Sequence, residues 1–290
     1  MIKKAIILCA GTGSRMYPVT RSINKQLIPV FDKPMFYYPL SLMMLCGIRE
    51  FIFIINEGQE QNFRNAIGNE KDLGIKIKFI VQTYPKGLPD AFLITEELIK
   101  NESVAMILGD NFFYGSMLSS LIKQSFNNIN GCNIYLYTSN KTSAYGVVEF
   151  DKKNKIKKIV EKPKKTSSHL IITGLYVFDK NASEYAKKLK PSKRNELEIV
   201  DLIRLYKIKK KLRVVKLGRG SAWMDVGNFK DLHSASNFVQ NIEERQLYKV
   251  GCIEEIAFNN KWINKYNILN RIKHCANESY SRYLKNLIAK

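Results

Sequence analysis

No apolar run in the 290-residue sequence reaches the roughly 18 residues that a membrane-spanning helix needs. The first ten residues do place lysines before a short apolar run, which is also how a secretion signal begins. That run ends in Gly11, Gly13 and Arg15, which is typical of a phosphate-binding loop and not of a cleavage site. We therefore expect a cytoplasmic protein without membrane contact.

Cysteine and histidine are scarce, and neither type is clustered. A scattered set without close pairs predicts reduced thiols, buried as small apolar side chains, in a reducing compartment. It also argues against a histidine-based zinc site. The residues concerned are Cys9, Cys46, Cys132, Cys252, Cys275, His169, His233 and His274.

Acidic residues are few beside basic ones: 26 Asp and Glu stand against 47 Lys and Arg, a formal net charge of +21. Such a balance can indicate a nucleic-acid-binding protein. Here the lysines are spread along the chain together with abundant Asn and Ile, which is typical of a compositional bias with solvated lysines. We expect no nucleic acid as partner, and a positive field would attract small anionic substrates in either case.

In the first half of the chain, short apolar runs alternate with amphipathic segments. This alternation favours an α/β fold with a largely parallel sheet, in which ligands bind beyond the carboxyl ends of the strands. Gly11 and Asp110 both follow such strand ends and so indicate one site. The expected strands are Ile6–Leu8, Phe51–Ile55, Ile75–Val81 and Val104–Leu108, and the expected helices are Phe36–Cys46, capped by Gly47, and Ala91–Lys100.

After about Asn133 the pattern changes to strands of a more antiparallel kind, followed by helices. From Glu243 onward the sequence is helix-like and rich in lysine. We expect a domain over residues 1–242 and a helical appendage over residues 243–290 packed on it. The later strands are predicted at Ile134–Thr138, Gly146–Phe150, Ile156–Val160, Ile171–Phe178 and Leu212–Leu217, and the helices at Ala182–Leu189, Leu197–Tyr206 and Phe229–Ile242.

The glycine-rich turn directly after the first strand is a candidate phosphate-binding loop. Glycines allow backbone N–H groups to approach phosphates, and Arg15 can neutralise their charge. Lys25 follows at a distance that could bring a second cation to the same anion. Taken alone, the turn is as often an ordinary strand-to-helix connection, and Lys25 alone would be a surface lysine.

Several motifs in order along the chain resemble those of the sugar-phosphate nucleotidyltransferase family, and within it the bacterial glucose-1-phosphate thymidylyltransferases. The resemblance runs from Ile6 to about Phe258. It implies an enzyme with a Rossmann-like nucleotidyltransferase fold: a mixed, mostly parallel central sheet, a smaller antiparallel sugar-binding part and a helical C-terminal tail. The motifs include Leu8–Pro18, Lys25–Val30, Asp32–Met35, Leu108–Asn111, Tyr145–Phe150, Glu161–Pro163, Glu196–Ile199 and Trp223–Gly227.

The resemblance also implies a role for individual residues. Catalytic roles fall to Arg15, Lys25, Asp110 and Lys162, and the magnesium ligands would be Asp110 and Asp225. The nucleotide would be bound by Leu8, Gly11, Thr12, Gly13, Ser14, Arg15, Gln26, Gln82 and Gly87. The sugar phosphate would be bound by Tyr145, Gly146, Glu161, Lys162, Ile172, Thr173, Arg194 and Trp223.

The implied reaction joins dTTP and glucose 1-phosphate, with Mg²⁺ as cofactor, to give dTDP-glucose and pyrophosphate. The sugar-phosphate oxygen is already anionic at neutral pH, so that no nucleophilic side chain and no general base are needed. Positioning and charge neutralisation would supply most of the catalysis. The family is usually a homotetramer that a downstream dTDP-sugar inhibits at a secondary site, so we expect the same here.

Four positions depart from the family pattern and bear on specificity. The loop has Ala10 where Gly is usual, which would cost of order 1 kcal/mol if that position required a positive φ. Pro89 and Asp90 interrupt the usual Gly-Leu-Ala-Gln-Ala, and Asn195 stands where Gly is usual. Two alternatives stay open: the same chemistry with UTP or a modified sugar 1-phosphate, and a non-catalytic regulator that binds sugar nucleotides.

Overall fold

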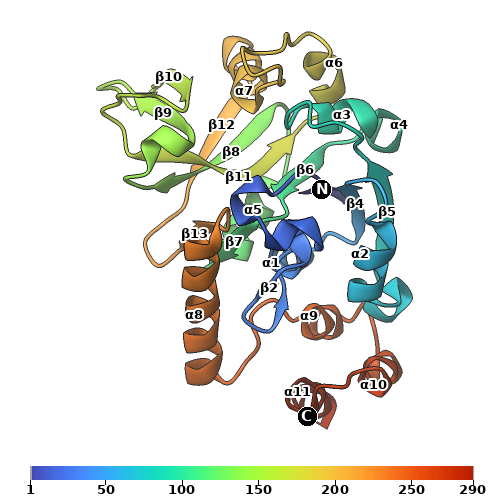
Figure 1. The fold of residues 1–290 in the computed structure, drawn as a ribbon. Coiled ribbons are helices and arrows are strands. Elements are labelled where there is room, and N and C mark those ends of the chain that lie inside the picture. The colour runs from blue at the N-terminus through green and yellow to red at the C-terminus, as the bar shows by residue number, and fades with distance from the viewer. Residues whose placement is uncertain (1, 290) are drawn as a thin grey trace.

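A nine-stranded mixed sheet runs through the computed structural model, which describes residues 2–289 (Figure 1). Four of its strands are parallel and lie in the order β6-β1-β4-β5. Their bounds are Lys4–Cys9 for β1, Glu50–Ile55 for β4, Lys76–Val81 for β5 and Val104–Leu108 for β6. These are the four strands predicted in the first half of the chain.

The second part of the sheet is mostly antiparallel, as predicted. Strand β11 pairs antiparallel with β6, β8 and β9, and β10 pairs antiparallel with β9. Strand β12 differs, because it runs parallel to β8 after helix α7 has carried the chain back across the sheet. The bounds are Cys132–Thr138 for β8, Gly146–Phe150 for β9, Ile156–Glu161 for β10, Leu170–Phe178 for β11 and Leu212–Lys216 for β12.

Helices cover both faces of the sheet, and alternate residues of each strand enter different cores. Ile7 and Phe53 pack under α1, α2, α5 and α9, whereas Ile6 and Ile52 pack under α3, α6 and α7. Burial on both faces explains why the parallel strands read as continuous apolar runs. The bounds are Tyr37–Leu45 for α1, Glu60–Ile67 for α2, Asp90–Ile94 for α3, Leu118–Ser125 for α5, Ala182–Ala186 for α6, Ile199–Ile208 for α7 and Ile253–Asn259 for α9.

The helix predicted over Ala91–Lys100 is two short helices, α3 and α4 (Glu96–Ile99). The break lies at the buried Thr95, whose hydroxyl donates to the carbonyl of Ala91 at 2.6 Å. A threonine bonded back to the preceding turn weakens the regular helix there. Two further pairings were not predicted: β2 (Pro29–Val30) with β3 (Lys33–Pro34), and β7 (Asn111–Tyr114) with β13 (Ala222–Asp225).

The last quarter of the chain is helical, as expected. Helix α8 (Phe229–Gln246) continues one turn beyond the predicted Ile242, and then α9, α10 (Lys265–Lys273) and α11 (Glu278–Ala289) follow. Helix α9 packs on α1, and α10 and α11 pack on each other beside it (Figure 1). None of the helices within residues 2–289 is long and apolar enough to span a membrane.

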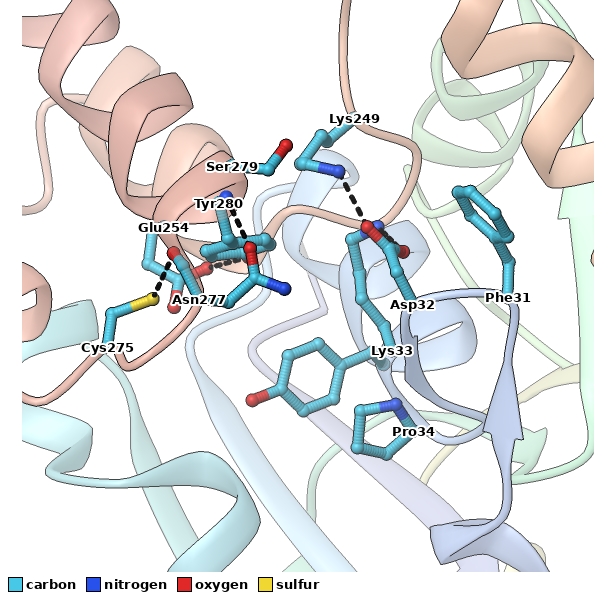
Figure 2. Close-up of a pocket in the computed structure, with 11 residues that line it drawn as sticks. Phe31, Asp32, Lys33, Pro34, Lys249, Glu254, Cys275, Asn277, Ser279 and Tyr280 are labelled. Carbon is cyan, nitrogen blue, oxygen red and sulfur yellow. Dashed lines mark hydrogen bonds and ion pairs between the residues drawn. The ribbon is translucent and has the colours of Figure 1, made fainter.

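Charged side chains attach these C-terminal helices to the β2–β3 turn (Figure 2). Lys33 contacts both Asp32 and Glu243, with 2.9 Å to the Glu243 carboxylate, and Lys249 lies 2.6 Å from Asp32. Nearby, Glu254 accepts hydrogen bonds from Tyr280 and from Arg271 at 2.8 Å each. Each of these charges has a partner of opposite sign, which offsets the loss of hydration on burial.

Candidate active site

The glycine-rich loop after β1 is held in an open shape by Asn56. The Gly11 N–H donates to Asn56 Oδ1 and Asn56 Nδ2 donates to the Gly11 carbonyl, both at 2.9 Å. Gly11 has φ 128° and Gly13 has φ 59°, whereas Ala10 does not have a positive φ. The methyl group of Ala10 therefore causes no backbone strain. Sequence reasoning missed Asn56, although its place directly after β4 is the same strand-end signal that marked Gly11.

Lys25 and Gln26 enter the site from a short 3₁₀ helix, Lys25–Leu27, capped by the side chain of Asn24. Lys25 is buried and its ammonium group contacts the Asp110 carboxylate. Gln26 is 5% exposed, and its Oε1 is the only buried side-chain oxygen or nitrogen within residues 2–289 that lacks a hydrogen-bond partner. An unpaired buried acceptor is costly, so this atom points to a ligand that donates to it.

Asp110 and Asp225 are brought together although 115 positions separate their numbers. Asp110 follows β6, and the β7–β13 ladder pairs Asn111 with Asp225. The N–H of Val226 donates to the Asp110 carbonyl at 3.0 Å. Burial and the Asp110 charge raise the pKa of Asp225 to about 6, against the opposing effect of Lys25 and Arg15. The charge of Asp225 is thus disfavoured in the protein alone, and a bound cation would relieve this.

Asn111 fixes the relative position of three strands at this point. Its buried Oδ1 accepts from the Gly174 N–H at 3.0 Å and from the indole N–H of Trp223 at 2.7 Å, and its Nδ2 donates to Asp110. A β-carbon at Gly174 would lie 2.5 Å from that oxygen, so this contact requires glycine. The sequence motif contained Asn111, but nothing in the sequence indicated this organising role.

Arg15 lies against the turn that follows Asp225. A β-carbon added at Gly227 would lie 2.8 Å from Arg15 Nη2. Thr12, Ser14 and Arg15 are themselves exposed on the loop, so these side chains are accessible to a phosphate chain. Arg15, Lys25 and the two carboxylates therefore form one charged group at the carboxyl ends of the strands.

A cavity of about 320 Å³ extends from this loop toward the antiparallel part of the sheet. It contains seven residues predicted for nucleotide or sugar phosphate, together with Ala10 and a group of residues that sequence reasoning did not assign. The predicted residues are Leu8, Gly11, Gln82, Gly87, Glu161, Lys162 and Arg194. The unassigned ones include Pro85, Leu88, Glu196, Leu197, Glu198 and Ile199.

The far end of this cavity carries a charge cluster. Arg194 binds Glu198 at 2.7 Å and lies 3.7 Å from Glu161, and Lys162 lies 3.8 Å from Glu161. Burial raises the pKa of Glu161 in spite of the neighbouring cations. Lys162 has φ 42°, a left-handed conformation that is uncommon for lysine, and its N–H donates to the Tyr145 carbonyl. Asn195 also has a positive φ, 61°, which explains why asparagine can stand where glycine is usual.

Three of the predicted sugar-phosphate residues have their polar groups occupied within the protein. The Thr173 hydroxyl is buried and donates to the Tyr135 carbonyl at 3.0 Å. The Trp223 indole N–H is bonded to Asn111, and the Tyr145 hydroxyl donates to Asp225 Oδ2 at 3.3 Å. Ile172 is buried, and a β-carbon at Gly146 would lie 2.9 Å from Val200 Cγ2. Trp223 and Tyr145 line a separate cavity of about 250 Å³ beside Asp225.

The donor set fits a hard cation that shares its ligands with a phosphorylated substrate. Within residues 2–289 there is no group of three or more His, Cys, Asp or Glu side chains able to hold a metal ion. Two carboxylates, Asp110 and Asp225, nevertheless lie together, and Asp225 lines a cavity of about 250 Å³. Mg²⁺ is commonly bound by one or two carboxylates while substrate phosphates and water complete its shell. These residues therefore fit such an ion better than a transition metal.

Comparison with known proteins gives consistent results over nearly the full chain. A family model described as nucleotidyl transferase matches residues 4–242. The chain is 45% identical over 287 residues to a glucose-1-phosphate thymidylyltransferase of Neisseria gonorrhoeae, covering 99% of this chain and 100% of that protein.

Two solved structures are similar to most of the chain. One is a Bacillus anthracis protein assigned as a glucose-1-phosphate thymidylyltransferase, in complex with sucrose, with a TM-score of 0.76 and 30% identity over 83% of this chain and 96% of that one. The other is a UDP-glucose pyrophosphorylase complexed with UDP-glucose, with a TM-score of 0.73 and 25% identity over 83% of this chain and 99% of that one.

Proposed function

Because this chain belongs to the nucleotidyl transferase family, we propose that it joins dTTP to α-D-glucose 1-phosphate, forming dTDP-glucose and pyrophosphate. The observation that carries this proposal is the meeting of two carboxylates and two cations next to the glycine-rich loop: Asp110, Asp225, Lys25 and Arg15. The cavity of about 320 Å³ extends from Leu8 and Gly11 at that loop to Glu161 and Lys162.

The nucleotide is assigned to the end of the cavity formed by the glycine-rich loop. The N–H groups of Gly11–Arg15 and the Arg15 side chain would bind the triphosphate. Gln26, with its unpaired buried oxygen, would accept from a sugar hydroxyl of the nucleoside. Gln82 and Gly87 line the cavity beside the loop and would contact the base.

The sugar phosphate is assigned to the opposite end of the cavity, which is formed by the end of β10 and by the segment that contains Arg194. Lys162 would bind its phosphate, and Glu161 would accept from sugar hydroxyls. Glu198 holds Arg194 by two hydrogen bonds, at 3.2 and 2.7 Å, which directs this guanidinium toward the acids around the cavity. We assign Thr173 and Trp223 a supporting role here, since their own donors are bonded within the protein.

Catalysis follows from position and charge. An oxygen of the sugar phosphate attacks the α-phosphorus in line, the new O–P bond forms, and the bond to the bridging oxygen of pyrophosphate breaks. Arg15 and Lys25 would stabilise the charge that develops on the departing pyrophosphate, and Lys162 would orient the attacking phosphate. Asp110 and Asp225 would hold Mg²⁺, which would supply neutralisation of the phosphate charge.

The experiment that tests the function is pyrophosphate release with Mg²⁺ across a grid of substrates. The grid combines dTTP, UTP, CTP, ATP and GTP with several sugar 1-phosphates. We expect the highest kcat/KM for dTTP with glucose 1-phosphate. The similar UDP-glucose pyrophosphorylase holds UDP-glucose, a uridine nucleotide. A maximum with UTP would therefore keep the chemistry and change the nucleotide specificity. Silence across the grid would favour the non-catalytic regulator.

We further propose a cytoplasmic homotetramer under feedback control by a downstream dTDP-sugar. A cavity of about 600 Å³ between α1, the turn after β7 and α9 shares no lining residue with the active-site cavity and could hold such a ligand. Leu45, Met117 and Leu247 are exposed apolar side chains that subunit contacts would cover. Light scattering would show a mass of four chains, and a dTDP-sugar formed downstream of dTDP-glucose would inhibit without raising the KM for dTTP.

A further inference from the structure

The amide group of Gln82 is held by a buried carboxylate behind it. Gln82 follows β5 and lines the active-site cavity, whereas Asp90, the first residue of α3, does not reach the cavity and is 6% exposed. Gln82 Nε2 donates to Asp90 Oδ2 at 2.7 Å. Asp90 is one of the departures from the family pattern, which usually has glutamine at this place.

Backbone hydrogen bonds fix the shape of the loop between these two residues. The N–H of Asp90 donates to the Gly87 carbonyl, and the N–H of Leu197 donates to the Lys86 carbonyl at 2.8 Å. Gly87 has φ 94°, and a β-carbon there would lie 2.1 Å from the Leu197 carbonyl oxygen. The loop is therefore held by the backbone bond to Leu197 and by the bond within it to Gly87. The Gln82–Asp90 hydrogen bond joins its two ends.

A carboxylate can only accept hydrogen bonds, whereas a primary amide has one accepting and one donating end. Asp90 therefore requires the Gln82 NH₂ group to face inward, and Oε1 must point away from it. No described residue donates to Gln82 Oε1 within residues 2–289, so this oxygen is available to a ligand. Glutamine at position 90 could accept or donate and would leave both orientations of the Gln82 amide open.

We infer that Asp90 is a positioning residue for base specificity: it fixes the Gln82 amide so that only an acceptor faces the base. Thymine and uracil carry an N3–H donor on the edge used for recognition, whereas cytosine has a bare N3 acceptor there. An acceptor opposite an acceptor is left unpaired, which a buried site rejects strongly. Asp90 thus excludes cytosine nucleotides without touching them. This inference depends on the proposed function, because it places the base beside Gln82.

The test compares kcat/KM for dTTP, dUTP and dCTP, each with glucose 1-phosphate, in the wild type and in Asp90→Asn. The isosteric Asn side chain can donate as well as accept, so it no longer fixes the orientation of the Gln82 amide. We therefore expect the dTTP:dCTP ratio of kcat/KM to fall about tenfold or more, which corresponds to one hydrogen bond of about 1.4 kcal/mol. The change should lie in KM, with kcat for dTTP nearly constant. The dTTP:dUTP ratio should not change, because both bases keep the N3–H.

Two controls separate positioning from a general effect on the fold. Asp179→Asn removes another buried acid, which is bonded to Tyr206 at 2.8 Å and does not line the active-site cavity, and should leave the dTTP:dCTP ratio unchanged. In a Gln82→Ala background, Asp90→Asn should no longer move the ratio, because Asp90 acts only through Gln82. If Asp90→Asn does not fold, Asp90→Gln, the usual residue of the family, provides the same comparison.

An unchanged ratio in Asp90→Asn, an equal change in Asp179→Asn, or an effect that persists without the Gln82 side chain would each overturn the inference. Failure of the proposed function is a different result. A wild-type enzyme that does not use dTTP contradicts that function before any variant is made. If the wild type uses dTTP and the dTTP:dCTP ratio is unchanged in Asp90→Asn, only the role of Asp90 is contradicted.

Discussion

The guanidinium group of Arg15 packs on the backbone of Gly227, which leaves no room for a side chain there. Gly227→Ala would displace Arg15 from the triphosphate site, so we expect kcat/KM for dTTP to fall about tenfold or more, the value of roughly one charged hydrogen bond. The matched control is Gly218→Ala, where an added β-carbon meets nothing within 4 Å. Steady-state kinetics with dTTP measure kcat/KM for both variants. Equal values in the two would contradict this role of Arg15.

Asp225 has opposite effects on stability and on turnover. Burial and the Asp110 charge disfavour the charge of Asp225, so Asp225→Asn should melt at or above the temperature of the wild type in EDTA. The same change should lower turnover by about 100-fold or more, corresponding to about 3 kcal/mol of barrier, because a cation ligand is lost. Asp110→Asn should lose turnover as well.

Thermal melting and pyrophosphate release at saturating Mg²⁺ check both expectations for the carboxylates. Mg²⁺ with dTTP should raise the melting temperature of the wild type more than that of either variant, since ligands stabilise the state that binds them. Full turnover in both variants at saturating Mg²⁺ would contradict the metal assignment.

Among the secondary-structure elements, the β7–β13 ladder has the greatest influence on the active site. It is a two-stranded pairing outside the main sheet, yet it places Asp225 opposite Asn111 and beside Asp110. Neither strand was predicted, because each is only four residues long and its pairing partner lies about a hundred residues away. Short strands with distant partners have a weak local signal, whereas β1 and β4 are long, apolar and easily recognised.

The C-terminal helices depend on the buried pair Glu254–Arg271, which joins α9 to α10 at 2.7 Å. Burial opposes the charge of Glu254, but Arg271 and Tyr280 together lower its pKa below the ordinary value. A lowered folded-state pKa stabilises the protein above the unfolded pKa of about 4.5, and that contribution is lost as the pH falls through the folded value.

We therefore expect Glu254→Gln to destabilise the protein at pH 7 by roughly 3–5 kcal/mol, because Arg271 stays buried without a counter-charge. Below about pH 4.5 the stability of the wild type should fall toward that of the variant. Chemical denaturation at several pH values measures the difference. The exposed pair Lys188–Glu184 is the control, and Glu184→Gln should have little effect. A difference that does not depend on pH would contradict the assignment.

For the molecule as a whole, the net charge of +21 acts on two anionic substrates. A positive field raises their local concentration at low salt, and salt screens it. When NaCl is raised from about 0.03 to about 0.3 M, the screening length falls about threefold. We expect the KM for dTTP and glucose 1-phosphate to rise several-fold while kcat stays nearly constant, measured at fixed Mg²⁺. A constant KM would show that the lysines act only as solvated surface residues.

The sequence by itself determined the fold class and the parallel strands, because apolar runs, glycine-rich turns and helix periodicity are local signals. It also placed Gly11 and Asp110 at strand ends, where ligands bind in α/β sheets. The family motifs added Lys25, Lys162 and Asp225 as candidates. Four of the five cysteines, Cys275 being the half-buried exception, are buried as their dispersed positions predicted.

Only the tertiary structure decided how these residues act on one another. The Asn56 clamp on Gly11, the Asn111 contacts that place Asp225, and the Asp90 contact that orients Gln82 all join segments whose relation no local pattern encodes. The same holds for the occupied hydroxyl of Thr173. The physical reason is that strand propensity and turn chemistry depend on neighbouring residues, whereas hydrogen-bond partners and the orientation of an amide depend on the packing of the complete fold.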